Sequence, residues 1–391
     1  MKIAFIVQRC GRDVFGGAEA LTLQIGLHLS KFFETEILTT RAREATTWKN
    51  HYPEGIEKIE NLTIRRFSVD HERDPNFVPL SQYLELNNGD LEKGKEFIEA
   101  SGPVCNQLLK YIQDNKDQYD LFVFVGYLYW QTYHGLPLVG EKSILLSTAH
   151  DEPWIYFKIF ETVFTIPKGY LFLTNTEKEF VHKKFGHIEK PYQVVGHGMD
   201  LSIPSRNSKA PKVKLPDEYM LYIGRISAGK GCQILSDFYN RYTSLRKTNL
   251  KLVMLGTIEH KIENNNAIVF ENASEEEKFF VLRNCNLFVM PSQFESLNMA
   301  CLEAWLFKKP ILVNGNSSVL VEHCKTGNGG LYFHNYEEFS ECLDLTLQDK
   351  ALATELGNNG EKYVRENYNW DITLQKYKTL FNKVLAATKT H

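Results

Sequence analysis

The sequence predicts an α/β protein made of two doubly wound units, each a parallel sheet flanked by helices. Short β-branched and aromatic runs alternate with helix-length segments along most of the chain, which is typical of βαβ units. At 391 residues the chain is longer than one hydrophobic core usually organises. The stretch Ser202–Asp217 holds three prolines and four basic residues without a helix or strand period. We therefore expect a linker there, a first unit over residues 1–203 and a second over residues 204–371.

Each expected strand is a short apolar run rich in Val, Ile, Phe or Tyr, and each expected helix repeats apolar residues every three to four positions. The first unit has expected strands at 2–7, 35–40, 62–67, 121–125, 143–148 and 170–174, and expected helices at 18–29 and 90–114. The second has expected strands at 219–223, 250–255, 267–270, 286–290 and 310–313, and expected helices near 231–242, 274–284 and 298–308. A last helix over residues 372–391 has no strand after it.

Composition excludes several classes of protein. A hydrophobic content of 43% with 24% charged residues excludes a disordered chain. The net charge of −3 argues against a nucleic-acid binder that relies on bulk charge. Seven cysteines without a CxxC pair suggest neither a disulfide framework nor a zinc knuckle. The longest apolar stretch, Leu121 to Trp130, is too short to span a membrane, so we expect a cytoplasmic protein.

Four strand ends carry residues suited to binding, because ligands of doubly wound folds collect at the carboxyl ends of the strands. The first is a glycine-bearing turn that ends in Gly16, Gly17 and Glu19 and leads into a helix. Gly17 and Ala18 stand where a P-loop has Lys-Ser/Thr, and the glycine spacing is not GxGxxG. The paired glycine can bring helix amides to a phosphate or a sugar hydroxyl, or it can be a structural helix-entry turn.

The second strand end carries His150, Asp151 and Glu152 after an apolar run. A histidine beside two acids can hold a substrate hydroxyl or align a proton, although an isolated pair of this kind is more often structural. A metal site is not favoured, because no further ligand lies at helical spacing.

The third strand end runs from Tyr222 to Gly231 and includes Gly224, Arg225 and Lys230. The guanidinium can fork across two phosphate oxygens, and the ammonium supplies a point charge at a helix N-terminus. The segment therefore predicts a diphosphate site, and the alternative is a solvated turn with incidental charges.

The fourth strand end carries two glutamates, Glu295 and Glu303, with seven residues between them. If a helix begins near Asn298, Glu303 lies on the same side as the apolar residues Met299 and Leu302, where a carboxylate needs a partner. That partner is either a lysine or backbone amides, or else a pair of ribose hydroxyls.

Taken in order, these segments resemble the family 4 glycosyltransferases, which are retaining enzymes of the GT-B fold. The resemblance covers nearly the whole chain and rests on a motif set spread over both units, namely Gly16-Gly17-Ala18-Glu19, His150, Gly198-Met199-Asp200, Gly224-Arg225, Lys230-Gly231, the PSxxEx7E pattern of Glu295 and Glu303, and Asn369-Trp370-Asp371. It implies two Rossmann-like domains facing across a cleft, with the acceptor bound by the first and a nucleotide sugar by the second. It also implies that the last helix, 372–391, packs back on the first domain.

The resemblance also implies roles for single residues. Arg225 and Lys230 would hold the diphosphate, Glu303 would hold the ribose, and Glu295 would lie beside the transferred sugar. Gly17 would face the diphosphate from the first domain, and His150 would contact the sugar near its reacting carbon. The remaining members of the implied site are Gly224, Ser296 and Leu297 on the donor side and Glu19 and Asp151 on the acceptor side.

Two positions depart from the family pattern. Many members have Phe-Gly where this chain has Leu297 and Asn298, and this difference is expected to alter how the sugar is held. A glycine is also common where Lys308 stands, and here only the end of a helix is expected to change.

The implied function is transfer of a sugar from a UDP- or GDP-sugar to the hydroxyl of a saccharide or lipid-linked acceptor, in cell-surface polysaccharide or glycolipid assembly. Two alternatives remain: an epimerase or hydrolase of the same fold that uses no acceptor, and a non-catalytic module that binds nucleotide sugars. We expect no cofactor and no divalent metal, because no DxD motif occurs in the sequence.

Two segments bear on the acceptor. Residues 41–118 carry arginines and aromatic residues, including Arg41, Arg43 and Trp48, and are expected to select the acceptor unless they form a solvated surface. The cationic run Val181–His187 predicts peripheral contact with the inner face of a membrane, and the alternative is a solvated helix face.

Overall fold

A computed structural model describes residues 1–14, 16–202, 214–259, 267–271 and 273–388 of the chain, which divides into two compact units. Unit 1 comprises Met1–Gly198 with Trp370–His391, and unit 2 comprises Met199–Asn369. The boundary expected at 203/204 and most of the expected linker 202–217 lie outside the described residues.

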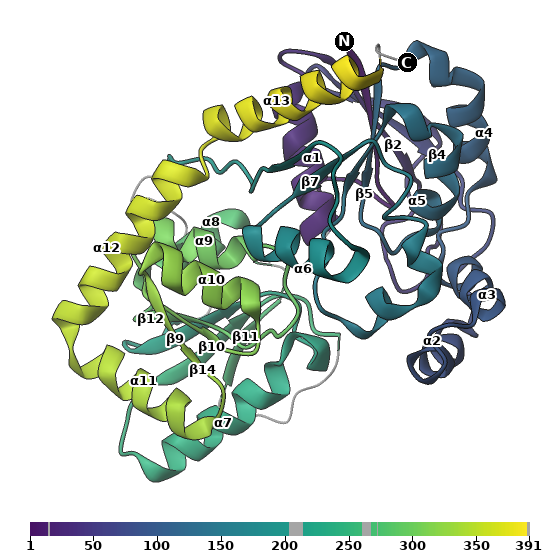
Figure 1. The fold of residues 1–391 in the computed structure, drawn as a ribbon. Coiled ribbons are helices and arrows are strands. Elements are labelled where there is room, and N and C mark those ends of the chain that lie inside the picture. The colour runs from purple at the N-terminus through teal and green to yellow at the C-terminus, as the bar shows by residue number, and fades with distance from the viewer. Residues whose placement is uncertain (15, 203–213, 260–266, 272, 389–391) are drawn as a thin grey trace. The chain divides into compact units, whose positions relative to one another are not determined.

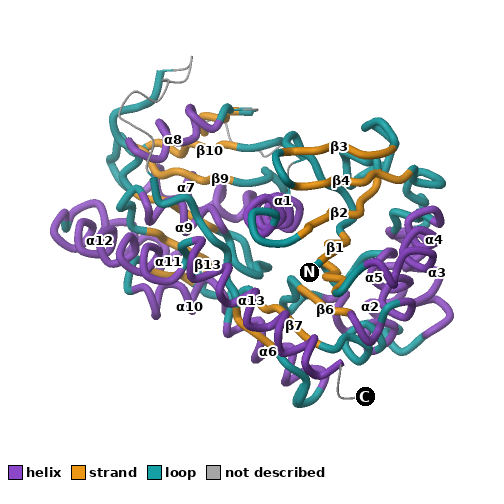
Figure 2. Tube along the Cα trace, turned by 90° about the horizontal axis from the view of Figure 1, so that it is seen from above, coloured by secondary structure: helices purple, strands orange, loops and turns teal. Residues whose placement is uncertain are grey.

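The sheet of unit 1 has, among the described residues, eight strands in the order β3-β4-β2-β1-β5-β6-β7-β8. Figure 2 shows β3, β4, β2 and β1 side by side in this order. All pairings are parallel except that of β3 with β4. The strands are β1 (Lys2–Ile6), β2 (Glu34–Thr40), β3 (Gly55–Ile59), β4 (Leu62–Phe67), β5 (Leu121–Val125), β6 (Ser143–Leu146), β7 (Gly169–Phe172) and β8 (Tyr192–Val194).

The two edge strands, β3 and β8, are absent from the sequence-based expectation. The central strand β5 is fully buried. By contrast, the three middle residues of β3 are exposed, and two of them, Glu57 and Lys58, are charged. An edge strand needs only one buried face and one partner, so its apolar signal is weak.

The helices of unit 1 are α1 (Gly17–Leu29), α2 (Phe77–Leu86), α3 (Leu91–Ser101), α4 (Asn106–Asn115), α5 (Trp130–Gly135), α6 (Asn175–Phe185) and α13 (Trp370–Thr388), with short 3-10 turns between some of them (Figure 1). The single helix expected over 90–114 is wrong, because α3 ends at Gly102, whose φ is +65°, and Pro103 follows. A left-handed glycine and a residue without an N–H together end a helix.

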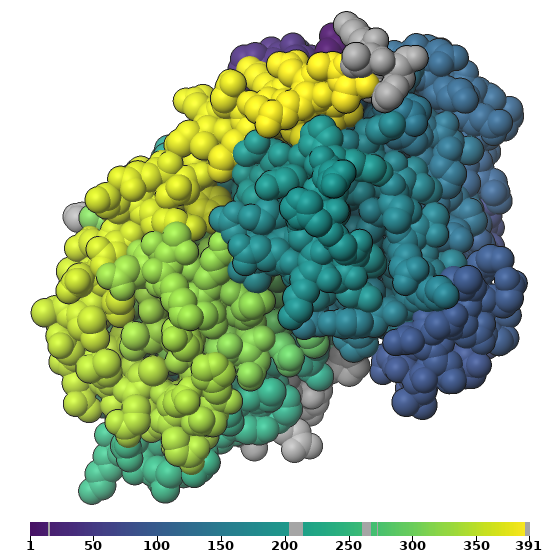
Figure 3. All heavy atoms as spheres, in the orientation of Figure 1, coloured from purple at the N-terminus to yellow at the C-terminus, as the bar shows by residue number. Residues whose placement is uncertain are grey.

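The last helix, α13, belongs to unit 1 and packs against α1 and β8. Its first residue, Trp370, stacks on His28 in the last turn of α1, with ring centroids 3.7 Å apart. Figure 3 shows this helix, in yellow, on the surface of the unit. The C-terminal segment is thus fixed to α1 by an aromatic contact at its first residue.

The sheet of unit 2 has, within the described ranges, six strands in the order β11-β10-β9-β12-β13-β14, and all its pairings are parallel. The strands are β9 (Tyr219–Ile223), β10 (Lys251–Leu255), β11 (Ala267–Phe270), β12 (Leu287–Met290), β13 (Ile311–Asn314) and β14 (Gly330–Phe333). The helices are α7 (Cys232–Leu245), α8 (Glu275–Asn284), α9 (Met299–Leu306), α10 (Ser318–Gly327), α11 (Tyr336–Gln348) and α12 (Lys350–Asn367).

Each sheet reverses its strand order at one point. In unit 1 the first strand, β1, lies between β2 and β5, and in unit 2 the first strand, β9, lies between β10 and β12. Connections leave such a pair of strands in opposite directions, so a crevice forms at their carboxyl ends. The loops after β1 and β5, and those after β9 and β12, are therefore the places to look for a site. No helix among the described residues is long and apolar enough to cross a membrane.

Candidate functional site

The loops after β9 and β12 are joined in unit 2 by an ion pair and a close backbone contact. Lys230 Nζ lies 2.7 Å from Glu295 Oε1, and both side chains are largely buried. Gly231 follows with φ +72°, and a Cβ there would lie 2.4 Å from the carbonyl oxygen of Pro291. Only glycine fits this conformation at this distance. The structure thus brings Lys230 and Glu295 together, as expected for residues of one site.

Arg225 lies in the same loop but contacts a different acid. Its guanidinium pairs with Glu259 at 3.1 Å and is about half exposed. Its carbonyl oxygen accepts a hydrogen bond from the Tyr222 hydroxyl at 2.7 Å, which fixes the turn at Gly224. Of the two cations expected to bind the diphosphate, Lys230 is therefore paired with Glu295 and Arg225 with Glu259.

After Glu295, the chain is held by a hydrogen bond between a backbone carbonyl and a buried histidine. Leu297 is buried, and its carbonyl oxygen lies 2.6 Å from His323 Nε2. Because a carbonyl oxygen only accepts, Nε2 must carry the hydrogen. Burial lowers the pKa of His323, which favours this neutral form. Ser296, which lies between Glu295 and Leu297 in the chain, is half-buried.

The two departures from the family pattern share one backbone feature. Asn298 has φ +64° and Lys308 has φ +57°, so both adopt the left-handed conformation in which glycine is favoured. Asn298 begins α9, and its Oδ1 accepts a hydrogen bond from the N–H of Cys301 at 3.0 Å. Lys308 follows the end of α9, as expected for a change at a helix end.

Glu303 on α9 pairs with Lys278 of α8, with 2.7 Å between Oε1 and Nζ. Each of the two side chains is 19% exposed. Burial disfavours the charge on Lys278, but the Glu303 carboxylate outweighs it, so the pKa of Lys278 lies above its ordinary value. Of the partners considered for Glu303, the structure shows the lysine. The neighbouring Met299, expected in a buried stripe, is only half-buried.

In unit 1, Glu19 on α1 is buried and joins the loop after β1. Its Oε1 accepts hydrogen bonds from Gln8 Nε2 at 2.8 Å and from Arg9 Nε at 2.6 Å. These contacts join Glu19, which was expected on the acceptor side, to the loop after β1. Gly17 differs, because a Cβ there would meet no described atom within 4 Å. The fold itself therefore does not require glycine at position 17.

His150 is held at the end of β6 by two neighbours. Its Nδ1 lies 3.3 Å from the carbonyl oxygen of Thr148, and its Nε2 lies 3.3 Å from Glu152 Oε2. Glu152 in turn accepts a hydrogen bond from the Tyr127 hydroxyl at 2.6 Å. Asp151 is exposed and instead accepts from the Tyr156 hydroxyl at 2.6 Å. The expected cluster thus consists of His150 with Glu152, and Asp151 points to a different partner.

Glu177, which sequence reasoning missed, is buried beneath this turn. It accepts hydrogen bonds from Ser147 Oγ at 2.5 Å, from the N–H of Ala149 at 2.8 Å and from the N–H of Leu173 at 2.6 Å. Burial raises its pKa to about 7. The spacing Thr174-x-x-Glu177, a helix-capping pattern after an apolar strand, is the signal that could have found it.

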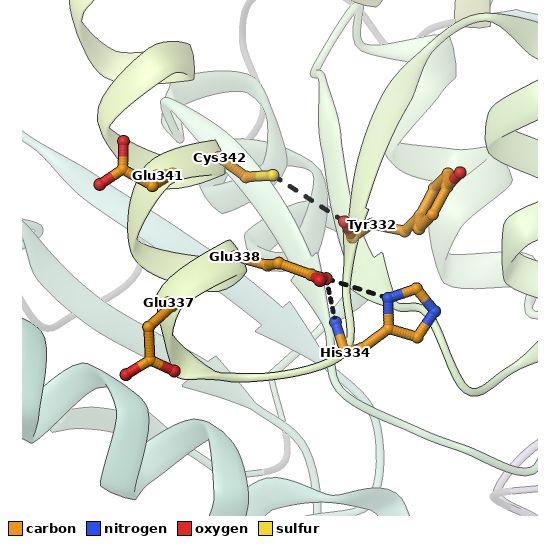
Figure 4. Close-up of a pocket in the computed structure, with 6 residues that line it drawn as sticks. All are labelled: Tyr332, His334, Glu337, Glu338, Glu341 and Cys342. Carbon is orange, nitrogen blue, oxygen red and sulfur yellow. Dashed lines mark hydrogen bonds and ion pairs between the residues drawn. The ribbon is translucent and has the colours of Figure 1, made fainter.

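A shallow acidic hollow lies elsewhere in unit 2, at the carboxyl end of β14 (Figure 4). Glu338 accepts from the N–H of His334 at 2.8 Å and lies 2.9 Å from Nδ1 of the same residue. β14 is an edge strand, two strands from the reversal at β9 and β12. We therefore place the candidate site at the reversal and not at this hollow. Within the ranges that the structure describes, no group of three or more His, Cys, Asp and Glu residues could hold a metal ion.

Comparisons with known proteins identify a matching family model and several similar chains. Residues 205–363 match the family model "Glycosyl transferases group 1". The capsular polysaccharide biosynthesis glycosyltransferase CapM of Staphylococcus aureus is 22% identical over 219 residues, which are 50% of this chain and 57% of CapM. The chain spans about half the length, or less, of the curated relatives it matches.

Two solved structures cover nearly the whole chain. Sucrose-phosphate synthase from Thermosynechococcus elongatus has a TM-score of 0.73 at 16% identity, over 99% of both chains. Anabaena HepE, in a crystal structure with UDP-glucose, has a TM-score of 0.66 at 14% identity, over 97% of this chain and 99% of HepE. The predicted GT-B fold, two Rossmann-like parallel-sheet units, is confirmed.

Proposed function

We propose that this chain is a retaining glycosyltransferase of family 4 that moves a sugar from a UDP- or GDP-sugar to a hydroxyl of a saccharide or lipid-linked acceptor. The observation that carries the proposal is the Lys230–Glu295 pair at the strand reversal of unit 2. The group 1 family match over residues 205–363 and the name of CapM support glycosyl transfer and an assignment to polysaccharide or glycolipid assembly. The complex of HepE with UDP-glucose supports a nucleotide-sugar donor.

In this proposal unit 2 binds the donor. During transfer the bond between the anomeric carbon and the phosphate oxygen breaks, and the nucleoside diphosphate leaves with the bonding electrons. The acceptor oxygen bonds to the anomeric carbon and gives its proton to an oxygen of the leaving phosphate. Negative charge grows on the leaving phosphate, and a fixed cation there stabilises the transition state more than the ground state. Lys230 is assigned this role, with Arg225 as the second cation.

The carboxylates have separate assignments. Glu295 pairs with Lys230. It is assigned a place beside the transferred sugar, and Gly224, Ser296 and Leu297 are assigned to the rest of the donor site. Glu303 is assigned to the ribose hydroxyls, because a carboxylate can accept two hydrogen bonds from a diol. Lys278 binds Oε1 of Glu303, and no other described residue binds Oε2, so the carboxylate can bind the lysine and the ribose together.

Unit 1 is assigned the acceptor. His150, supported by Glu152, is assigned to the transferred sugar near its reacting carbon. Gly17 is assigned to the donor diphosphate, and this role predicts that Gly17→Ala folds normally but transfers sugar slowly, since no described atom would meet the new Cβ. A Gly17→Ala variant with unchanged activity would remove that assignment.

The enzyme is proposed to act without a divalent metal or other cofactor, with Arg225, Lys230 and helix amides supplying the positive charge. It is also proposed to be cytoplasmic and to reach its acceptor at the inner face of a membrane. In the run Val181–His187, however, Val181 is buried and Phe185 stacks on Phe164 with ring centroids 4.0 Å apart. Membrane contact there would therefore rest on charge, through Lys183 and Lys184. Salt-sensitive sedimentation with anionic vesicles tests this, and no binding at low salt would refute it.

The central experiment combines donor binding with product analysis. A thermal-shift screen with UDP and GDP identifies the nucleotide, because a ligand that binds the native state raises its apparent stability. Radiolabelled UDP- or GDP-sugars are then incubated with the chain and a pool of saccharide and lipid-linked acceptors. A new glycoside with the donor's anomeric configuration is the expected product. Released or epimerised sugar without acceptor, or nucleotide binding without any transfer, would contradict the proposal and favour the epimerase or the binding module.

A further inference from the structure

An arginine in unit 1 is packed between aromatic rings without a counter-charge. Arg73 lies in the loop after β4, and its guanidinium carbon is 4.9 Å from the ring centroid of Trp48 and 4.4 Å from that of Phe77. Among the described residues it forms no ion pair, and its Nε is buried without a hydrogen-bond partner. A guanidinium has five N–H donors, and removing them from water is unfavourable unless they are bound.

The charges around Arg73 do not compensate it. Burial lowers the pKa of Arg73; Tyr129 opposes this shift, and the nearby Arg9 guanidinium adds to it. Arg9 is itself paired with a carboxylate, Glu19, at 2.6 Å. A guanidinium remains protonated even when its pKa falls, so a net positive charge stays at this position.

Trp48 and Tyr129 connect Arg73 to the loop after β5, at the strand reversal of unit 1. Strands β4, β2, β1 and β5 are neighbours, and their carboxyl ends lie at one edge of the sheet. Arg73 follows β4, Trp48 follows β2, and Tyr129 follows β5 and meets Trp48 edge to face at 6.2 Å. Trp48 is itself 1% exposed, and its Nε1 donates to the carbonyl oxygen of Ser101 at 2.6 Å. The aromatic support of Arg73 is thus fixed by three loops and a helix end.

We propose that Arg73 binds an oxyanion of the acceptor, a phosphate or a carboxylate. This inference rests on the proposed function, and it names the chemical class of acceptor that unit 1 takes. The two rings hold the guanidinium plane in one orientation, so its fork can bind two oxygens with little further ordering. The region 41–118, expected to select the acceptor, contains Arg73, Trp48 and Phe77. A guanidinium that only fills space between rings is the competing explanation.

Hydrogen–deuterium exchange of the full chain tests this without donor or transfer. Orthophosphate and acetate are added separately, and we expect one or both to slow amide exchange at residues 44–50 and 71–77. Protection by orthophosphate alone identifies a phosphate-bearing acceptor, and protection by acetate alone identifies a carboxylate. Arg73→Gln should raise the half-saturating concentration at least tenfold, and Arg73→Lys, which keeps the charge but not the fork, several-fold.

The matched control is Arg241→Gln in unit 2. Arg241 also lies over a ring, 3.7 Å from the centroid of Tyr336, but it is paired with Glu337 at 3.1 Å. This variant should retain full protection of residues 44–50 and 71–77. If Arg73→Gln does not fold, Arg73→Lys decides the question.

No protection by either anion, or protection unchanged in both Arg73 variants, would overturn the inference. Transfer activity with no anion protection would remove the Arg73 site and leave the proposed function intact. Protection by an anion without transfer from any donor would support the Arg73 site and contradict the proposed glycosyltransferase function.

Discussion

The two units differ in how far the charged side chains at the carboxyl edges of their sheets form ion pairs. In unit 2 the candidate acids and cations neutralise one another, as Lys230 with Glu295 and Lys278 with Glu303. Unit 1 has one such pair after β1, Arg9 with Glu19, but the buried Glu177 and the half-buried Arg73 form no ion pair among the described residues. Glu177 is instead bound by a hydroxyl and backbone N–H groups, and Arg73 by two aromatic rings.

The difference indicates two ways of preparing a site. A paired cation is held in position at little electrostatic cost, and a polyanion can bind it together with helix amides. An unpaired charge is not neutralised before a ligand binds. It also makes the stability of the surrounding fold depend on pH or on a bound anion. The tests below change one unit at a time, so the two arrangements can be separated.

The largest effect is expected from breaking the unit 2 pair. Lys230→Ala and Glu295→Gln should each slow transfer by about 10²-fold or more, as found when one preorganised donor is removed from an active site. Arg225→Ala should act in the same direction if its guanidinium binds the diphosphate. Single-turnover rates at saturating donor provide the measurement, with the exposed Lys325→Ala as the control. Near-normal rates for both Lys230→Ala and Arg225→Ala would refute the cationic seat.

The next effect concerns the uncompensated acid of unit 1. The pKa of Glu177 is raised from 4.5 to about 7, so between these values the folded chain binds more protons than the unfolded chain. The free energy of unfolding should therefore fall as pH rises through this window, by on the order of 3 kcal/mol from this group alone.

Denaturant unfolding of wild type and Glu177→Gln between pH 4.5 and 7.5 measures this slope. The variant cannot titrate and should lose that part of the slope, although it is less stable overall because an N–H loses its acceptor. Glu179→Gln, on the same helix but exposed, is the control and should keep the slope. Parallel curves for wild type and Glu177→Gln would contradict the raised pKa.

A smaller effect separates the two carboxylates of unit 2. Glu303→Gln should weaken binding of the nucleoside diphosphate by about 1.5–3 kcal/mol, the usual contribution of a charge-assisted hydrogen bond. Glu295→Gln should leave that affinity nearly unchanged. Because Glu303 also binds Lys278, the paired variant Lys278→Met is needed, and it should keep most of the affinity. Calorimetric titration decides, and equal losses in Glu303→Gln and Lys278→Met would mean that the carboxylate acts only through the lysine.

The smallest expected effect is that of chelation. If cations of the protein replace a metal, transfer in excess EDTA should equal transfer in untreated buffer. Added Mn²⁺ should not increase it. Loss of activity with EDTA and recovery with Mn²⁺ would overturn the metal-free proposal and direct attention to the acids beside His150.

Much of the fold could be predicted from the sequence because buried strands are continuous apolar runs. β5 and β12 are fully buried and were expected within a residue or so of their bounds. The edge strands β3 and β8 were missed, since they bury little and carry a weak pattern. The interruption of the 90–114 helix at Gly102 and Pro103 was visible in the sequence but outweighed by the apolar period on both sides.

By itself, the sequence determined which residue types stand at the strand ends: the Gly224–Gly231 loop, the two glutamates of unit 2 and the His150 turn. Tertiary structure alone decided their partners. Lys230 meets Glu295 because β9 and β12 are neighbours, although 63 residues separate the end of one from the start of the other. Glu303 meets Lys278 because α8 and α9, the helices before and after β12, lie close together. Among the described residues, neither Arg73 nor Glu177 forms an ion pair. Strand order sets which loops meet, and the local apolar pattern that defines a strand does not encode its neighbours.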